Sequence, residues 1–131
     1  MRWEFRADTP IYTQLMERVQ RMIVSGALGP GERLPSVRSF ALEVGVNPNT
    51  MHRALAELER SGLIYSQRTV GYFVTREPET LAAARETLAA ARTRAYLRDM
   101  AELGCKPKEI EALLQTQRQS EGSDEHGNSE L

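Results

Sequence analysis

The chain has 131 residues, of which 40% are hydrophobic and 27% are charged, and its formal net charge is −1. This length corresponds to about one domain with an appendage, and the composition is that of an ordinary soluble protein. No apolar run approaches the ~20 residues that a membrane-spanning helix requires, and the first residues lack the apolar stretch of a signal peptide. We therefore expect a cytoplasmic protein with no membrane partner.

The charge is distributed unevenly along the chain. Residues 1–77 carry 10 basic and 8 acidic side chains, residues 78–118 carry 7 and 6, and residues 119–131 carry 0 and 4. The three segments therefore have net charges of +2, +1 and −4. An acidic end masks a mildly basic body, so the overall charge does not argue against an anionic partner.

The first predicted helix lies in "TPIYTQLMERVQRMIVSG". Thr9 is the expected N-cap, with Pro10 at the first helical position and Gly26 as the stop. Its apolar residues follow a helical spacing; they are Ile11, Leu15, Val19, Met22 and Ile23.

Two short helices and a hairpin follow. Ser36 is expected to cap the first of these helices, which runs to about Glu43, and Asn47 to cap the second, with Pro48 inside it. Gly45 supplies the turn between them. Residues 63–67 and 71–75 are strand-like runs joined by a short turn. This order predicts a mostly α (α+β) fold, a winged helix-turn-helix DNA-binding domain over residues 1–77.

The chain changes character at Pro78. A long alanine-rich helix and a shorter helix are expected over residues 78–118, and residues 119–131 are expected to form a disordered acidic tail. Two helices alone bury such narrow apolar faces poorly, so this region is expected to dimerise. The candidate dimerisation residues are Leu81, Leu88, Ala91, Ala95, Tyr96, Met100, Leu103, Ile110, Leu113 and Leu114.

The helix that begins at Asn47 has two different faces. At about 100° per residue, Met51, Leu55 and Leu58 point toward the core. Asn49, Thr50 and Arg53 point the opposite way, near the end of the helix that enters the major groove in helix-turn-helix proteins. Asn pairs with adenine, Arg with guanine, and Thr contacts either hydrogen-bonding groups or a thymine methyl. The alternative is that the asparagines only cap the helix and that Arg53 is a solvated charge.

Residues 10–75 resemble the DNA-binding domain of the GntR family of bacterial transcription regulators. The segments that carry the resemblance are "PIYTQL", "SGALGPGERLPSVRSFA", "GVNPNTMHRALAELERSGLI" and "GYFV", and "VNPNT" followed by Arg53 resembles the YtrA-like subfamily. The resemblance implies a homodimer that represses transcription from a two-fold symmetric operator on double-stranded DNA. The candidate DNA-binding residues are Arg38, Asn47, Asn49, Thr50, His52, Arg53, Arg68 and Gly71.

Two positions depart from the family pattern. The wing reads "RTVG", so Thr69 stands where the family favours a residue suited to positive φ, and we expect a wing that is wider or reaches less deeply into the minor groove. His52 stands where many members carry a phosphate-binding arginine, and a mostly neutral imidazole gives a weaker contact.

Other functions find less support in the sequence. A winged helix that binds proteins instead of DNA is the alternative, although Asn49, Thr50 and Arg53 do not resemble the aromatic and aliphatic anchors of such surfaces. No catalytic constellation, metal-ligand spacing or cofactor motif is present, so no enzyme, metal or cofactor is expected. Cys105 is expected to be a small buried hydrophobe rather than a redox switch. The two terminal helices lack the volume for a ligand pocket, although an unidentified small-molecule effector at a dimer seam stays open.

Overall fold

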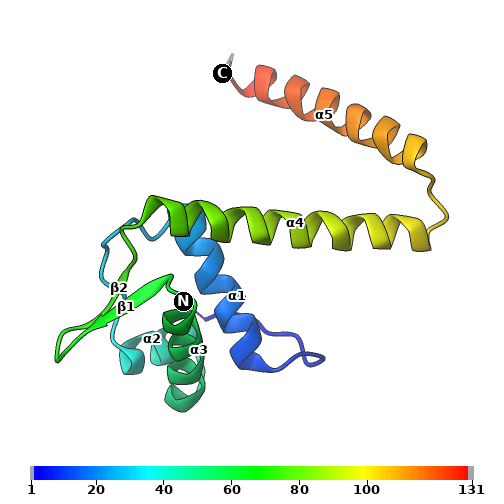
Figure 1. Ribbon diagram of the computed structural model, residues 1–131. Helices are drawn as coiled ribbons and strands as arrows, with labels where there is room; N and C mark the ends of the chain where they lie inside the picture. The colour runs from blue at the N-terminus through cyan, green and yellow to red at the C-terminus, as the bar shows by residue number, and fades with distance from the viewer. Residues whose placement is uncertain (1, 130–131) are drawn as a thin grey trace. The chain divides into compact units, whose positions relative to one another are not determined.

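The computed structural model describes residues 2–129, with side chains described through residue 122. The chain divides into two compact units, residues 1–88 and 89–131, and the fourth helix continues from one into the other. The elements, in chain order (Figure 1), are α1 (Ile11–Val24), α2 (Val37–Val44), α3 (Pro48–Arg60), β1 (Ile64–Gln67), β2 (Gly71–Val74), α4 (Pro78–Glu102) and α5 (Pro107–Ser129).

The core of residues 1–88 lies where α1 and α2 pack against α3. Leu15 and Val19 of α1 and Leu55 of α3 are fully buried, as their helical spacing predicts. Leu63, Ile64 and Val74 extend this core to the hairpin. The helix-turn-helix and the hairpin therefore share one hydrophobic core.

The caps of the two short helices are those expected from the sequence. The Ser36 side chain accepts a hydrogen bond from the Ser39 N–H, and the Asn47 side chain accepts one from the Asn49 N–H. Gly45 ends α2 in the left-handed conformation, at φ 86°, which a residue with a Cβ rarely adopts. These local signals fix the angle at which the chain enters α3.

The start of α1 differs from our expectation. Pro10, not Thr9, is the N-cap, and no side chain caps the helix. The side chain of Gln14 organises this end instead: its amide donates to the carbonyls of Thr9 and Arg6 and accepts from the Arg6 N–H, at 2.8–2.9 Å. Gln14 is 8% exposed, so the buried amide has partners for both of its ends.

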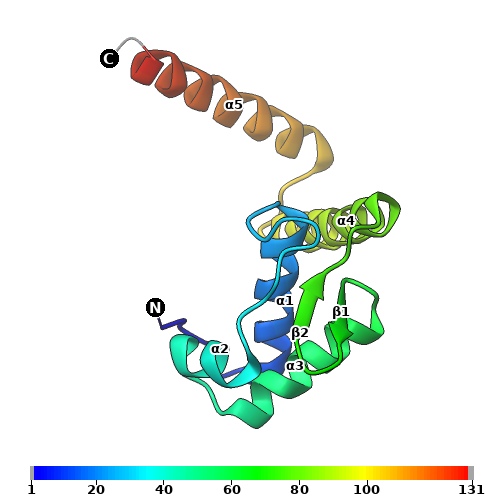
Figure 2. The same ribbon diagram turned by 90° about the vertical axis from the view of Figure 1, so that its left-hand side faces the viewer.

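The hairpin is antiparallel, and its register pairs Ile64 with Val74 and Gln67 with Gly71. Figure 2 shows the two strands beside α3, which contacts β1. Arg33 adds an isolated antiparallel bridge to Phe73, which the sequence did not predict. The linker before α2 therefore lies along β2 as a partial third strand.

The first turns of α4 belong to the winged-helix unit. Leu81 and Ala84 are partly buried and pack against its core. Leu81 was predicted as a dimerisation residue, and the structure gives it a contact within its own chain. This packing explains why the compact unit extends to residue 88 rather than ending near Glu77.

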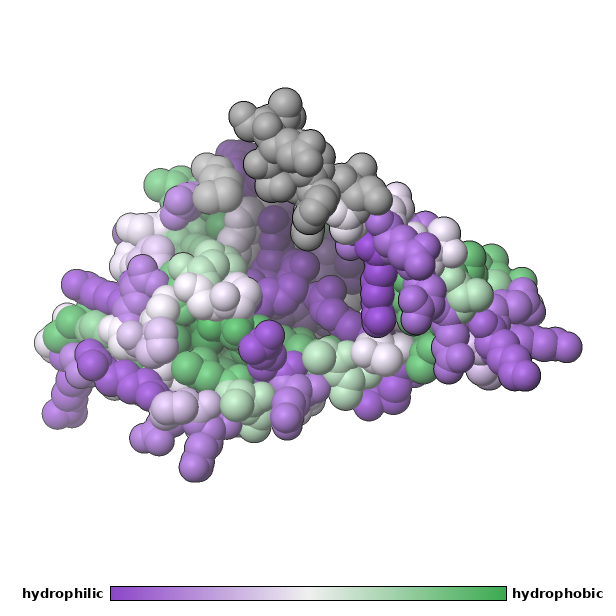
Figure 3. Space-filling model, turned by 90° about the horizontal axis from the view of Figure 1, so that it is seen from above, coloured by the Kyte–Doolittle hydropathy of each residue, from purple (hydrophilic) through white to green (hydrophobic). Residues whose placement is uncertain are grey.

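In residues 89–122, Ile110 is the one buried hydrophobic residue among the side chains that the structure describes. Among the large hydrophobic candidates, Leu103 is 76% exposed and Leu113 is 44% exposed. Figure 3 shows apolar surface, in green, among charged side chains at the right, the side on which Figure 1 shows the end of α4. This region keeps much of its apolar surface in contact with solvent.

The last helix is longer than predicted. We expected it to end near residue 118, and it continues through Ser129. Residues 115–121 are mostly Gln, Glu and Arg, which are good helix formers, and no proline follows to stop the helix. The side chains of residues 123–131 lie outside the described part, and the predicted divisions at residues 78 and 119 stay predictions. In the described part of the chain, no helix combines the length and hydrophobicity needed to cross a bilayer.

Candidate nucleic-acid interface

The N-terminal half of α3 presents the predicted recognition residues to solvent. Asn49, His52 and Arg53 are exposed and Thr50 is half-buried, whereas Met51 on the opposite face is fully buried. The angular spacing of the residues predicted that these polar residues and Met51 lie on opposite faces of the helix. The exposed face therefore carries hydrogen-bonding groups suited to the edges of bases.

Asn47 has a different geometry from the other candidates. Its side-chain oxygen lies 2.8 Å from the Asn49 nitrogen and is occupied by the cap. Its amide NH₂ group keeps its donors for another partner. Asn47 therefore positions α3 and can donate to a phosphate, while Asn49 keeps its whole side chain available.

Arg53 does not extend freely into solvent. Its guanidinium carbon lies 3.7 Å from the centroid of the Tyr12 ring, a cation–π contact between α3 and α1. The pairing depends on how α1 crosses α3, so neither residue signals it in the sequence.

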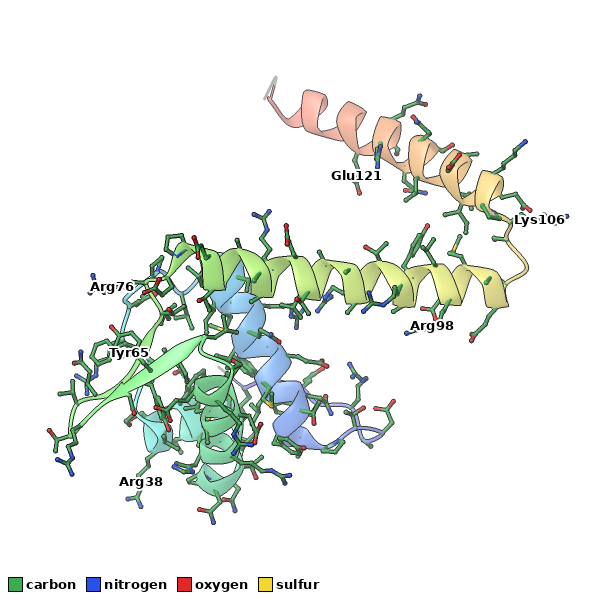
Figure 4. All side chains as sticks on the ribbon, viewed as in Figure 1. Arg38, Tyr65, Arg76, Arg98, Lys106 and Glu121 are labelled. Atoms are coloured by element: carbon green, nitrogen blue, oxygen red, sulfur yellow. The ribbon has the colours of Figure 1, made fainter. Side chains whose placement is uncertain are left out.

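Arg38 lies in the first turn of α2, where it is exposed and projects away from the protein (Figure 4). None of the ion pairs among the described side chains includes it, since these are Arg6–Asp8 and Arg60–Glu57. A guanidinium group without an acidic neighbour is well suited to a DNA phosphate, whose negative charge it neutralises.

The wing tip is formed by Arg68, Thr69 and Val70. Thr69 adopts φ 65° in spite of its branched Cβ, and the Val70 N–H closes the turn by donating to the Gln67 carbonyl at 3.0 Å. Our expectation of a wider wing assumed that Thr69 avoids positive φ, and that assumption is wrong. Arg68 is exposed at this tip.

Three contacts fasten the wing to the rest of the domain. The Arg33 guanidinium donates to the Val70 carbonyl and lies beside Gly71. The Glu59 carboxylate of α3 accepts from the N–H and the hydroxyl of Ser66, at 3.1 and 2.6 Å. Glu59 therefore ties α3 to the first strand of the hairpin.

Tyr72 lies on β2 near this link. Burial, and secondarily the negative charge of Glu59, raise the pKa of its phenol above the ordinary value of 10.0. The phenol therefore stays neutral at physiological pH and adds no negative charge beside the wing.

Among the residues that the structure describes, no group of three or more His, Cys, Asp or Glu is placed to hold a metal ion. Cys105 is free and half-buried. A capped helix with an exposed polar N-terminal half, a preceding short helix and a hairpin wing on one core define a winged helix-turn-helix protein.

The comparisons with known proteins identify the family. Residues 11–74 match the model for "Bacterial regulatory proteins, gntR family". The chain belongs to the GntR family, whose members are transcriptional regulators and not enzymes. It is therefore a DNA-binding transcriptional regulator.

Two curated relatives come from Bacillus subtilis. The uncharacterized HTH-type transcriptional regulator YhcF is 33% identical over 107 residues, which cover 82% of this chain and 88% of YhcF. The HTH-type transcriptional repressor YtrA is 39% identical over 75 residues, 57% of this chain and 58% of YtrA. The similarity to YtrA agrees with the subfamily that the "VNPNT" motif suggested.

Two solved structures share the fold. A GntR family transcriptional regulator from Listeria monocytogenes superposes with a TM-score of 0.80 at 32% identity, covering 86% of this chain and 98% of that chain. The DNA-binding domain of AraR, solved in complex with operator ORX1, gives a TM-score of 0.53 at 27% identity, covering 57% and 99%.

Proposed function

We propose that this regulator is a cytoplasmic repressor that binds a two-fold symmetric operator as a homodimer. The observation that carries the proposal is the exposed N-terminal half of α3, where Asn49 and Arg53 lie opposite the buried Met51. Tyr12 holds Arg53 at a defined place on this face, which favours base reading over a freely moving surface charge. In this proposal α3 enters the major groove, Arg38 and Asn47 contact phosphates, and Arg68 with Gly71 approaches the minor groove.

The dimer rests on a second observation. Residues 89–122 expose apolar side chains of both α4 and α5, including Leu97 at 44% and Leu113 at 44%. A second copy of the chain would cover this surface, because symmetric homodimers pair the same patch on both subunits. Two recognition helices are then set about one turn of DNA apart, ~34 Å, or a multiple of it.

A titration of labelled promoter DNA at two salt concentrations tests the proposal. Arg53→Ala should weaken operator binding by about 1–3 kcal/mol and relax the preference at one position in each half-site. Arg38→Ala should weaken binding to all sequences. It should also make the slope of log affinity against log salt concentration shallower by about 1, because about one counterion fewer is released on binding. Arg98→Ala, on the exposed surface of α4, is the control for loss of one charge.

An Arg53→Ala protein that keeps full affinity and the same sequence preference would show that α3 is not the base-reading element. Binding that is equally tight to every sequence, or absent at both salt concentrations, would instead favour a winged helix that binds another protein.

A further inference from the structure

A cleft of about 850 Å³ lies on the winged-helix unit, away from α3 and the wing. The N-terminal segment, the second half of α1 and the first turns of α4 form it, and all of its lining residues lie within residues 1–88. We name it the arginine cleft, after the residues that line it, which include Trp3, Arg18, Arg21, Met22, Val24 and Arg85.

The arginine cleft gathers three positive charges with no acidic neighbour. Among the described side chains, no carboxylate lies within 4.0 Å of Arg18, Arg21 or Arg85. Arg21 lies in the last turn of α1, where a cation interacts favourably with the helix dipole. That explanation does not extend to Arg18 or Arg85, which come from the middle of α1 and from α4.

Apart from Ser25, the rest of the lining is apolar or aromatic. The Arg18 guanidinium carbon lies 4.6 Å from the centroid of the Trp3 ring, so it is already oriented by a cation–π contact. Trp3 and Met22 also line a smaller cavity of about 170 Å³, whose other lining residues include Phe40, Val44 and Glu43. Trp3 and Met22 are therefore shared by the arginine cleft and a mostly apolar cavity.

We infer that the arginine cleft binds a small organic anion with a planar, apolar body. The anionic group would be held by Arg18 and Arg85, which suit carboxylate, sulfonate or phosphate oxygens. The body would lie on Trp3 and Met22, and the volume is within the range of about 300–1,000 Å³ that ligand sites occupy.

The position of Trp3 connects this site with the helix-turn-helix. The Trp3 ring packs edge-on against Phe40 of α2, with centroids 5.8 Å apart, and the backbone N–H of Trp3 donates to the Val44 carbonyl at 3.1 Å. A molecule lying on Trp3 therefore contacts the residue that supports α2, the helix that carries Arg38.

A matched pair of fluorescent dyes tests the inference on the full chain without DNA. Anilinonaphthalene sulfonate has a planar apolar body and an anionic group, and phenylnaphthylamine has the same body without the sulfonate. We expect the sulfonate dye to bind one site per chain, with energy transfer from Trp3, the single tryptophan. The neutral dye should bind about tenfold more weakly.

Arginine variants test whether the sulfonate dye binds in the arginine cleft or on the exposed faces of the terminal helices. Arg18→Gln and Arg85→Gln should each lower the affinity for the sulfonate dye about three- to tenfold and leave the affinity for the neutral dye unchanged. Arg98→Gln removes one charge from exposed α4 outside the cleft and should change neither affinity. Arg85 is exposed, so its variant keeps the fold, which circular dichroism checks.

Trp3→Ala removes the aromatic ring on which the dye would lie and should lower the affinity for both dyes. Equal affinity for the two dyes would overturn the inference, as would an effect of Arg98→Gln equal to that of Arg85→Gln. Because the measurement contains no DNA, its outcome is independent of whether the protein is a repressor.

Discussion

The two units of this chain use their apolar residues in opposite ways. In residues 1–88, 14 buried hydrophobic residues from three helices, the hairpin and the segments that join them form one cluster. In residues 89–122, Ile110 alone is buried among the described hydrophobic side chains. The first unit is closed around its own core, whereas the second exposes the surface that another molecule would cover.

Composition accounts for this difference. The buried residues of α1 and α3 are mainly Leu, Val, Ile and Met, each of which removes a large apolar area from water. The second unit instead has alanines at predicted interface positions of α4, such as Ala91 and Ala95, and each alanine buries little apolar area. Small side chains allow close approach of a second helix instead. If the proposed dimer forms through residues 89–131, folding and assembly use different segments of one chain.

Removal of residues 89–131 should give the largest effect. A shortened chain ending at Leu88 should stay folded and become monomeric, and its operator affinity should fall by about 10²–10⁴-fold because two linked half-sites become independent. Sedimentation and operator titration measure the two changes.

A chain ending at Glu77 is the sharper control for the boundary. It also loses Leu81 and Ala84, which pack on the core, so it should melt at a lower temperature than the chain ending at Leu88. A stable dimer formed by either shortened chain would disprove the separation of folding from assembly.

Leu55→Ala should test the closed core. Leu55 is fully buried in α3, so its truncation should lower the free energy of unfolding by about 2–5 kcal/mol, as measured by urea titration. Leu42→Ala, at a position that is 81% exposed, should stay within about 0.5 kcal/mol. Similar losses at both positions would mean that the core is less well packed than the burial indicates.

Thr69→Gly should show how much strain the closed unit supports at the wing. Glycine adopts positive φ without the steric cost that a Cβ carries, so the substitution should raise the free energy of unfolding by about 1 kcal/mol. Val70→Gly, at the next position and without positive φ, should lower it by about 0.5–1 kcal/mol. Thermal melts of the two variants should move in opposite directions.

Tyr12→Leu should test whether the first unit also holds Arg53 in place for binding. Loss of the ring removes a contact of about 0.5–1 kcal/mol, and operator affinity should fall by a similar amount. Tyr12→Phe keeps the ring and should bind like the unchanged protein. If Tyr12→Leu binds as tightly as Tyr12→Phe, the stacking does not contribute to recognition.

Deletion of residues 119–131 should give the smallest effect. The segment carries 4 acidic and no basic side chains, most of them outside the described side chains, so it repels DNA phosphates. Its removal should tighten non-specific DNA binding about threefold at low salt and leave it nearly unchanged at high salt, because the range of the repulsion falls to about 8 Å at physiological salt and to about 3 Å at about 1 M salt. Equal affinities at low salt would assign the segment no role in DNA binding.

Local signals predicted the first unit well. Ser36 and Asn47 were recognisable as caps because a cap depends on the next two or three residues, and the burial of Met51, Leu55 and Leu58 followed from helical spacing alone. The order of the elements and the place of the recognition helix followed from the same local patterns, and the family resemblance agreed with both.

Contacts between distant segments were not predictable in the same way. Tyr12 with Arg53, Glu59 with Ser66 and Arg33 with the wing each join elements whose crossing is set by the whole core. Leu81 looked like part of a continuous interface stripe because periodicity shows which residues share a face and not what that face meets. The roles of the candidate site residues in DNA binding and dimerisation stay predictions.

The side chain of Gln14 has a consequence for the dynamics of the N-terminal segment. The Arg6 N–H belongs to no helix or strand, yet it donates to a side-chain oxygen that is itself buried. Its hydrogen exchange should therefore be slow and governed by opening of the core rather than by fraying of the chain end. Residues 3–6 would then unfold together with α1, which keeps Trp3 in place for as long as the domain is folded.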